Sequence, residues 1–290
     1  MIYESRRNLG GFARIKSVYP SLTPTEKRVA DYCMEHPQET IYLSVTQLGE
    51  KCGVGESTII RFSQAAGFSG YQDLKLNLAL ELPTNAYQNE PMDGTLGPDD
   101  STQILIQKVT TMNVRALQDT AKLIDPQALE QAIVRIVQAK RLFLVGVGTS
   151  GITALDAQSK FLRIGRLAFA NSDAHLQIMS VANAKEGDVC LGISHSGSTK
   201  DTVDSMRLAK KNGMFTISVT DIVKSPITEI SDLVLLTGSA EDPLQGGSLS
   251  SKIAQVHVLD LIYTGVARHL GHEAEDSRRK SALSVVGKLY

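Results

Sequence analysis

The pattern of apolar and polar positions changes character once along the chain. Up to residue 82, apolar residues recur at the three- and four-residue spacing of helices. The stretch from Pro83 to Asp100 is rich in Pro, Gly, Asn and Asp and has no periodicity, which is typical of a linker. Beyond it, short continuous apolar runs alternate with helical patterns. The pattern therefore predicts an all-α domain over residues 1–82, a linker over 83–100 and an α/β domain over 101–290.

Helix starts in the first region share one signal, a hydroxyl residue followed three positions later by Glu or Gln. The segments are Thr23–Glu26, Ser44–Gln47 and Ser69–Gln72. In such a capping box the hydroxyl accepts a bond from a free N–H of the first turn, while the Glu or Gln reaches back. Helix stops follow at His36-Pro37, Gly53 and Gly67. Residues 1–82 are therefore expected to form a bundle of four or five short helices.

The segment Ser44–Phe68 has the layout of a helix-turn-helix motif. A helix ending at Gly53 is followed by a turn of three or four residues and a second helix from about Glu56. The second helix of this motif enters the major groove of DNA and contacts base edges near its N-terminus. The corresponding residues here are Glu56, Ser57, Thr58 and Arg61. An ordinary helical hairpin has the same local pattern and remains the alternative.

Charge limits how this region can bind nucleic acid. Several basic residues are candidates for phosphate contacts, namely Arg6, Arg7, Arg14, Lys16, Lys27, Arg28 and Lys75. Residues 1–82 nevertheless hold nine Lys or Arg and nine Asp or Glu, and the whole chain holds 30 and 31. This balance excludes a uniformly basic nucleic-acid coat. A DNA-binding face would have to come from segregation of charge onto one side.

Five apolar runs of the second region predict strands buried on both faces, because they are continuous rather than alternating. They are Leu142–Val145, Leu167–Ala170, Val189–Ile193, Phe215–Val219 and Leu233–Leu236. Helical patterns begin between them near Gly151, Asp173, Thr199 and Ser225, and longer helices are expected over Thr102–Leu123, Pro126–Gln138 and Ser248–Leu270. The chain is therefore α/β overall, with a doubly wound α/β sandwich and a mainly parallel sheet. The polar tail from Gly271 is left unassigned.

Two loops rich in glycine and hydroxyl groups each follow a strand directly. The first, GVGTSG at 146–151, matches GxGxxG and lets backbone N–H groups approach a phosphate at a helix N-terminus. The second, SHSGST at 194–199, offers several short hydroxyls, which suit a phosphate monoester. Because loops after parallel strands meet at one edge of the sheet, the pair predicts a site for a small phosphorylated ligand. Capped turns without a ligand are the alternative.

Other chemistries have weaker support. A nicotinamide dinucleotide site would also use GxGxxG, and Asp173, 22 residues after Gly151, stands where a ribose contact would be. His195 lies in the second loop and is a minor candidate for lining the pocket. His269 and His272 have no evident third ligand, so no metal ion and no cofactor are expected.

Cysteine usage and the N-terminus predict a cytoplasmic protein. The three cysteines, Cys33, Cys52 and Cys190, form no CxxC pair and are expected to be reduced, structural thiols. The N-terminal residues contain no apolar segment of a signal peptide. The chain also has no apolar run of the roughly 18 residues that would span a bilayer, so no membrane association is expected.

These motifs resemble a known family. Ser44–Phe68 followed by SGYQDLK, together with LTPTEKRVADYCMEHP from Leu22, resembles the N-terminal helix-turn-helix domain of RpiR-type bacterial transcriptional regulators. The second region resembles a sugar isomerase (SIS) domain through its GVGTSG and SHSGST loops, the strand ending at Thr220 and Lys224-Ser225-Pro226. The resemblance covers nearly the whole chain apart from the linker and the last twenty or so residues.

The resemblance implies a regulator of sugar or amino-sugar metabolism rather than an enzyme. A phosphosugar bound to the SIS domain would control affinity for a double-stranded DNA operator, and the protein would be a homodimer or homotetramer. The implied ligand site comprises Gly148, Thr149, Ser150, Ser194, Ser196, Gly197, Ser198, Thr199, Glu241 and Lys252. Within it, Ser150, Ser194, Ser196 and Thr199 would hold the phosphate. The implied DNA contacts are Glu56, Ser57, Thr58, Arg61 and Lys75.

The sequence departs from the family pattern at two positions. Gly55 stands where the family often has Ser at the start of the recognition helix, and Lys252 stands where it often has Arg. The alternative function is a phosphosugar isomerase or etherase. Such an enzyme needs a base near the sugar carbons, for which Glu241 and His195 are the candidates. For a dimer interface, we expect the helices Thr102–Leu123 and Ser248–Leu270.

Overall fold

The computed structural model describes residues 10–82, 96–239 and 249–288. The described residues up to Ser101 form one compact unit, and those from Thr102 onward form a second. The sugar contact Glu241 and the basic residues Arg6 and Arg7 lie outside the described residues.

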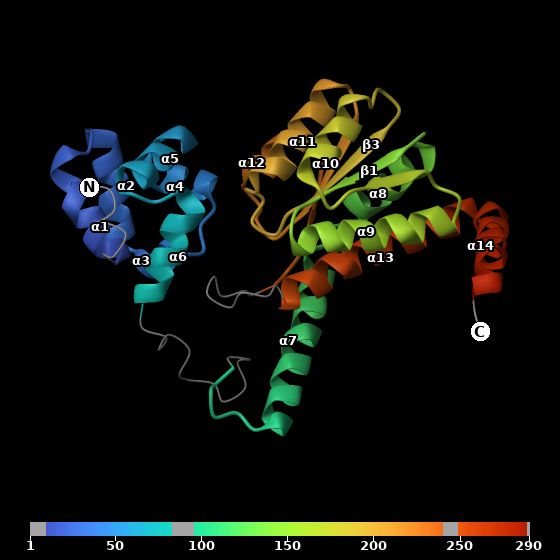
Figure 1. Cartoon of the computed structure of the whole chain (residues 1–290), viewed down its shortest axis with the longest axis horizontal. Helices are drawn as coiled ribbons and strands as arrows, with labels where there is room; N and C mark the ends of the chain where they lie inside the picture. The colour runs from blue at the N-terminus through green and yellow to red at the C-terminus, as the bar shows by residue number, and fades with distance from the viewer. Residues whose placement is uncertain (1–9, 83–95, 240–248, 289–290) are drawn as a thin grey trace. The chain divides into compact units, whose positions relative to one another are not determined.

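Short helices make up the described part of the N-terminal unit (Figure 1). They are α1 (Gly11–Val18), the 3-10 helix η1 (Tyr19–Ser21), α2 (Pro24–Glu35), α3 (Pro37–Thr40), α4 (Val45–Cys52), α5 (Glu56–Ala65) and α6 (Tyr71–Glu81). The count exceeds the expected four or five because Pro37 does more than end α2. Proline is favoured at the first position of a helix, and Pro37 starts the one-turn α3.

Two of the three expected capping boxes are confirmed. Thr23 caps α2 together with Glu26, and Ser44 caps α4 together with Gln47. The third is wrong, because α6 begins one residue later than expected, with Gly70 as its N-cap. The carboxylate of Asp73, rather than Gln72, accepts the bond from the Ser69 backbone N–H at 2.8 Å. An ionised carboxylate is a stronger acceptor than an amide, which favours this arrangement.

The helices of this unit pack around one apolar core that fixes the turn between α4 and α5. Leu48 of α4, Ile59 and Phe62 of α5, and Leu74 and Leu78 of α6 are fully buried in it. Truncating a fully buried aromatic residue such as Phe62 to alanine typically costs about 3–5 kcal/mol of stability. The core therefore holds α5 in a fixed orientation on α4.

The C-terminal unit contains a five-stranded sheet that is parallel throughout. Its strands are β1 (Leu142–Val145), β2 (Ala168–Ala170), β3 (Val189–Ile193), β4 (Phe215–Thr220) and β5 (Leu233–Leu236), in the order β2-β1-β3-β4-β5. All five strands were predicted. The differences are that β2 begins one residue later and β4 extends to Thr220.

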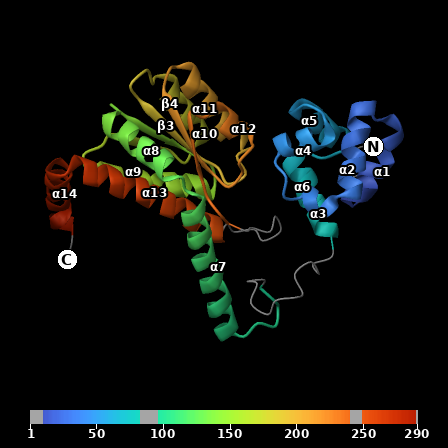
Figure 2. The ribbon, with the colours of Figure 1, turned by 180° about the vertical axis from the view of Figure 1, so that it is seen from behind.

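Helices cover both faces of this sheet, which makes a three-layer sandwich (Figures 1 and 2). The described helices of this unit are α7 (Thr102–Leu123), α8 (Pro126–Gln138), α9 (Thr149–Arg163), α10 (Ala174–Ala182), α11 (Lys200–Lys211), α12 (Pro226–Ile230), α13 (Leu249–Leu270), α14 (His272–Val285) and the 3-10 helix η3 (Val286–Lys288). Helices α8, α9 and α13 cover one face of the sheet, and α10, α11 and α12 cover the other. The polar tail that the sequence left unassigned is thus largely helical.

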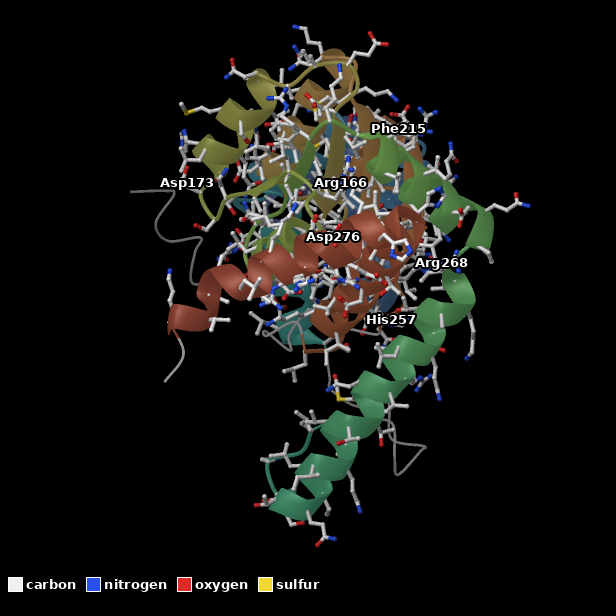
Figure 3. The ribbon with its side chains drawn as sticks, turned by 90° about the vertical axis from the view of Figure 1, so that its right-hand side faces the viewer. Arg166, Asp173, Phe215, His257, Arg268 and Asp276 are labelled. Carbon is white, nitrogen blue, oxygen red and sulfur yellow. The ribbon has the colours of Figure 1, made fainter. Side chains whose placement is uncertain are left out.

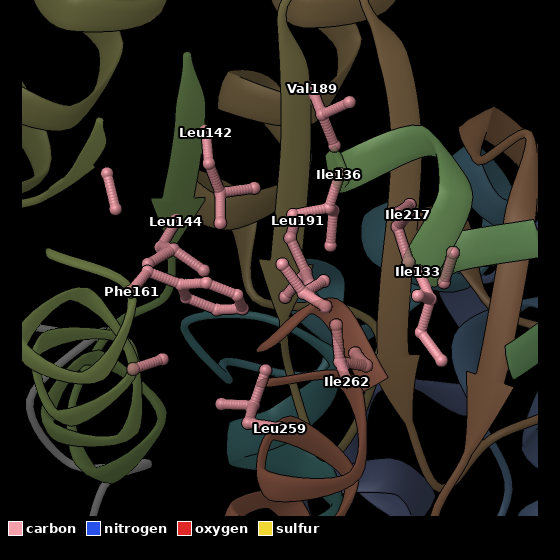
Figure 4. Packing of buried hydrophobic residues seen from close by; sticks show 14 of the residues in the cluster. Ile133, Ile136, Leu142, Leu144, Phe161, Val189, Leu191, Ile217, Leu259 and Ile262 are labelled. Atoms are coloured by element: carbon pink, nitrogen blue, oxygen red, sulfur yellow. The ribbon is translucent and has the colours of Figure 1, made fainter. Parts of the chain in front are cut away.

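Alternate strand residues supply two separate cores. Leu144 and Leu191 point to the side of α8, α9 and α13, where they meet Phe161 and Ile262 (Figure 4). Phe143 and its neighbours point to the side of α10, α11 and α12. Burial on both faces explains why the strands read as continuous apolar runs.

Helix α7 is only partly covered by its own unit. Its C-terminal half packs against α13, and Ala116 and Thr120 are buried there. Residues 102–107 are exposed, and side chains extend on both sides of this end of the helix (Figure 3). By contrast, α13 packs against α7, α8 and α9, so most of its surface is covered within the unit. No helix among the described residues is long and apolar enough to cross a membrane.

Candidate ligand site and DNA interface

The two loops singled out in the sequence meet at one point on the carboxyl edge of the sheet. Strands β1 and β3 are neighbours, yet α9 leaves β1 toward one face and α11 leaves β3 toward the other. A Cβ atom on Gly146 would lie 3.1 Å from the carbonyl oxygen of Ile193, so the first loop begins against the end of β3, where the second loop starts. This is the topological switch point of the sheet, where open α/β folds bind ligands.

The backbone of the first loop is held by a residue that the sequence reasoning missed. Gln177 of α10 accepts a bond from the Gly146 N–H at 3.1 Å and donates to the Gly146 carbonyl at 2.7 Å. It is almost fully buried. The only signal for it in the sequence is a single amide within the apolar helix AHLQIMSVA. Its role is to fix the loop.

Ser150 lies in the first turn of α9 and has a defined donor. The side-chain amide of Gln255, on α13, donates to the Ser150 hydroxyl at 3.1 Å, and both residues are buried. The Gln255 carbonyl in turn faces the hydroxyl of Thr153 at 3.4 Å. Because the Ser150 oxygen accepts from Gln255, its hydrogen is available for donation to a ligand.

The second loop folds back on itself through its own hydroxyls. Ser194 is buried and donates to the Thr199 hydroxyl at 3.3 Å, and the Ser198 N–H donates to the Ser196 hydroxyl at 3.3 Å. Gly197 has a φ of +62°, and a Cβ atom there would lie 2.6 Å from the Cβ of Ser225. Only glycine fits at this position, so the tight turn depends on it.

The helix N-termini that follow the two loops have free backbone donors. Among the described residues, neither Gly148 before α9 nor Thr199 before α11 makes a side-chain cap. By contrast, Asp125 caps α8, and Asp173 (labelled in Figure 3) caps α10 by accepting from the Leu176 N–H at 2.9 Å. Free N–H groups and the positive end of the helix dipole favour a bound anion. The Asp173 carboxylate therefore caps α10, which leaves it poorly placed to bind a ribose hydroxyl.

A histidine–carboxylate pair borders the second loop. The ring Nδ1 of His195 lies 3.3 Å from Oδ1 of Asp221, whose side chain is only 7% exposed. Burial opposes ionisation of Asp221, but the neighbouring His195 ring and hydrogen bonds from Ser239 and Thr237 outweigh it and lower the pKa of this carboxyl. The sequence reasoning missed Asp221. Its position directly after β4, the neighbour of β3, could have indicated it.

The remaining predicted sugar contacts are less well placed. Lys252 is exposed in the first turn of α13, three residues before Gln255. Glu241 lies outside the described residues. The described residues therefore place Gly148–Ser150 after β1 and Ser194–Thr199 after its neighbour β3, and Lys252 lies on the helix that supports Ser150.

The helix-turn-helix is formed by α4 and α5. Gly53 ends α4 in the left-handed conformation at φ 62°, and α5 begins at Glu56 after Gly55. Of the expected DNA contacts, Ser57 and Arg61 are exposed. Thr58 is only 8% exposed, and its hydroxyl accepts a bond from Arg61.

Glu56 and two of the basic candidates are directed inward. Glu56 accepts a bond from the hydroxyl of Thr46 on α4. Lys75 donates to the Leu43 carbonyl at 2.9 Å, and burial lowers its pKa to about 8. Arg14 is buried in α1 and stacks over Phe68 at 5.0 Å. By contrast, Arg28 is exposed on α2, with Nη1 3.4 Å from where a Cβ of Gly53 would lie. Arg28 therefore lies beside the turn.

The cysteines take no part in these sites. Cys33, Cys52 and Cys190 are free and buried. Burial raises the thiol pKa to about 12 for Cys33, about 11 for Cys52 and about 12 for Cys190. The thiols are therefore protonated and poorly nucleophilic at neutral pH. The described residues also contain no group of three or more His, Cys, Asp or Glu that could hold a metal ion.

The chain joins a helix-turn-helix to an α/β domain whose topological switch point suits an anion. This combination is typical of a DNA-binding regulator that also has a ligand-binding domain. The helix-turn-helix domain model of the rpiR family matches residues 9–85, and the SIS domain model matches residues 135–265. The chain belongs to the RpiR family of transcriptional regulators.

Relatives and a solved structure extend this result. The chain is 38% identical over 251 residues to an HTH-type transcriptional regulator of Haemophilus influenzae, covering 86% of this chain and 87% of the relative. It is 30% identical over 277 residues to the regulator RpiR of Escherichia coli, covering 96% and 92%. The structure of Vibrio vulnificus NanR complexed with ManNAc-6P matches with a TM-score of 0.80 at 28% identity, covering 97% of this chain and 100% of the other. These names favour the regulator over the isomerase or etherase.

Proposed function

We propose that this regulator binds operator DNA through α5 and that a sugar phosphate at the β1–β3 switch point controls its operator affinity. The observation that carries the proposal is that two hydroxyl-bearing loops follow the neighbouring strands β1 and β3 and each leads into a helix N-terminus without a side-chain cap. Such a site supplies several neutral donors and positive helix potential to one phosphate group.

The phosphate is proposed to lie between the loops. Ser150, Ser194, Ser196 and Thr199 contribute hydroxyls, Ser198 and Thr149 lie beside them, and Gly148 and Gly197 let the backbone come close. The sugar would extend toward Lys252 and Glu241. The similar NanR structure carries ManNAc-6P, which supports a hexose or amino-sugar phosphate as the ligand.

The DNA-reading face is proposed to centre on α5. Ser57 and Arg61 point outward, and an exposed arginine is suited to the O6 and N7 atoms of guanine. Arg28 beside the turn is placed for a phosphate. Glu56 and Thr58 are assigned a supporting role, because each is engaged within the unit.

A DNA-binding domain without net charge gains affinity for its operator when a dimer carries two copies of it. We propose a homodimer, or a homotetramer built from dimers, that reads a pseudo-palindromic operator in the cytoplasm. Helix α7 is the better interface candidate, since Ile104, Leu105, Ile106 and Val114 are exposed on it. Helix α13 offers less free surface because it packs within its own unit.

A thermal-shift screen tests the ligand assignment. The panel consists of hexose 6-phosphates and amino-sugar 6-phosphates, ManNAc-6P among them, with the free sugars as controls. A panel member at 100 times its dissociation constant should stabilise the protein by about 2.7 kcal/mol. Ser196→Ala should remove most of the shift, while Ser284→Ala on α14 should keep it. A panel without any shift contradicts the assignment. Turnover of a panel member, lost in Glu241→Gln, would support the enzyme instead.

A further inference from the structure

A chain of hydrogen bonds runs from the second ligand loop to helix α7. It starts at His195, which is held at two points by the segment after β4. Its ring faces the Asp221 carboxylate at 3.3 Å, and its carbonyl accepts from the Asp221 N–H at 3.2 Å. The hydroxyl of Thr220 donates to the same carbonyl at 3.1 Å. A displacement of this loop must therefore displace Asp221.

The carboxylate of Asp221 accepts hydrogen bonds from the segment after β5. Thr237 donates its hydroxyl to one carboxylate oxygen, and Ser239 donates both its hydroxyl and its backbone N–H to the other, the latter at 3.0 Å. Thr237 is buried, and the Asp221 side chain is only 7% exposed. With little water to substitute for these bonds, the two segments are expected to move together.

Gly238, between these two residues, connects the segment to α7. Its N–H donates to the hydroxyl of Thr120 at 3.0 Å, and Thr120 is fully buried. A Cβ on Gly238 would lie 3.0 Å from the backbone of Asp119, so the chain passes α7 in direct contact. Helix α7 begins at Thr102, where the second unit begins after the segment that joins it to the DNA-binding unit.

We propose that His195, Asp221, Gly238 and Thr120 form a relay that transmits occupancy of the ligand site to α7. Asp221 and Thr120 are positioning residues in this relay. The inference rests on the proposed function, because a relay needs an anion at the loop. It adds the route by which that anion changes the helix leading to the DNA-binding unit.

The test compares Thr120→Val with Thr120→Ser in the full chain. Valine keeps the shape but removes the acceptor for Gly238, whereas serine keeps the hydroxyl. Thr202→Val is the matched control, because Thr202 is equally buried on α11 and its hydroxyl has no hydrogen-bond partner in the described part. Operator affinity is measured on a duplex selected from random-sequence DNA, with and without the panel member that gives the largest thermal shift. Amide hydrogen exchange of residues 102–123 is followed under the same conditions.

For the wild type, Thr120→Ser and Thr202→Val, we expect the sugar phosphate to change operator affinity and exchange in α7. For Thr120→Val, we expect an affinity for the sugar phosphate within about threefold of the wild-type value. The ratio of operator affinities with and without the sugar phosphate should fall toward one, and hydrogen exchange in α7 should no longer respond to the ligand. Asp221→Asn should lose the same coupling, and the double variant should lose no more than either single one.

The outcomes separate the relay from the proposed function. If Thr120→Val keeps both responses, or if Thr202→Val loses them equally, the relay is overturned while the regulator stands. If the sugar phosphate changes exchange in wild-type α7 but not in Thr120→Val, and operator affinity never responds, the relay stands and the proposed function is wrong.

Discussion

Gln255 donates its side-chain amide to the hydroxyl of Ser150 across 3.1 Å, although the two residues are 105 positions apart in the sequence. The bond joins α13 to the first turn of α9, the turn that faces the proposed phosphate. It also fixes which way the serine hydrogen points. Gln255 therefore sets the donor geometry of the site without itself belonging to either loop.

Replacing Gln255 tests this role. Gln255→Glu puts an acceptor and a negative charge beside Ser150, so the serine would donate to the carboxylate instead of to the ligand. We expect affinity for the sugar phosphate to fall by at least tenfold, about 1.4 kcal/mol. Gln255→Met, which removes the bond without adding charge, should weaken binding less. Calorimetric titration checks both, and equal affinities in all three proteins would argue against the role.

Gly197 is expected to be irreplaceable in the second loop. Gly197→Ala combines a positive φ with a contact of 2.6 Å to the Cβ of Ser225, so the loop must shift. We expect it to abolish the thermal shift by sugar phosphates. Gly213→Ala is the matched control, since Gly213 also has a positive φ (77°) but no neighbour closer than 3.8 Å. It should cost about 1–2 kcal/mol of stability and leave ligand binding unchanged. Equal ligand affinity in the two variants would contradict the loop assignment.

Lys75 should make the stability of the N-terminal unit increase with pH in the alkaline range. Burial lowers its folded pKa to about 8, whereas an unfolded lysine titrates near 10.4. Between these values the unfolded state binds more protons, so the free energy of unfolding rises with pH. At pH 7, Lys75→Met should be more stable than the wild type by about 1–2 kcal/mol. Tyr71 continues to donate to the Leu43 carbonyl in this variant.

Calorimetry of the full chain at pH 7, 8.5 and 10 checks this prediction, and the difference between the two proteins should shrink as pH rises. Lys75→Met should also leave the salt dependence of operator binding unchanged, because the ammonium group is directed inward. A smaller salt slope in the variant would show instead that Lys75 contacts a phosphate.

Arg61 should carry much of the operator specificity. It is exposed on α5, so Arg61→Ala removes the proposed base contact without opening the core. We expect a loss of about 1–3 kcal/mol for the operator and little change for unrelated DNA. Arg207→Ala, which removes an exposed arginine paired with Asp204 on α11, is the control and should bind as the wild type does. Anisotropy titrations with the two duplexes distinguish these cases.

The layout of the fold was predictable because its signals are local. The continuous runs at Leu142–Val145 and Val189–Ile193 became strands with those same limits, and Thr23 and Ser44 became the expected caps. The expected box at Ser69 failed because Asp73, rather than Gln72, accepts from the Ser69 N–H and hydroxyl, and Gly70 is the N-cap. That competition depends on geometry within one turn, which spacing alone does not fix.

The supporting residues of the site were not predictable in the same way. The two loops can be recognised in the sequence by their glycines and hydroxyl residues. By contrast, Gln177, Asp221 and Gln255 are single polar residues in other elements. Their roles follow from strand order and from the buried contact of α13 with α9. The inward orientation of Lys75 and Arg14 likewise depends on packing, which a count of charges does not contain.

The most direct test of the regulator is its operator affinity measured at one salt concentration, with and without a saturating sugar phosphate from the panel. The wild type should change its dissociation constant for the operator by at least fivefold on addition of the ligand. Ser196→Ala should bind the same operator with no response to the ligand. An operator affinity that is unaffected by a sugar phosphate known to bind the wild type would contradict the account.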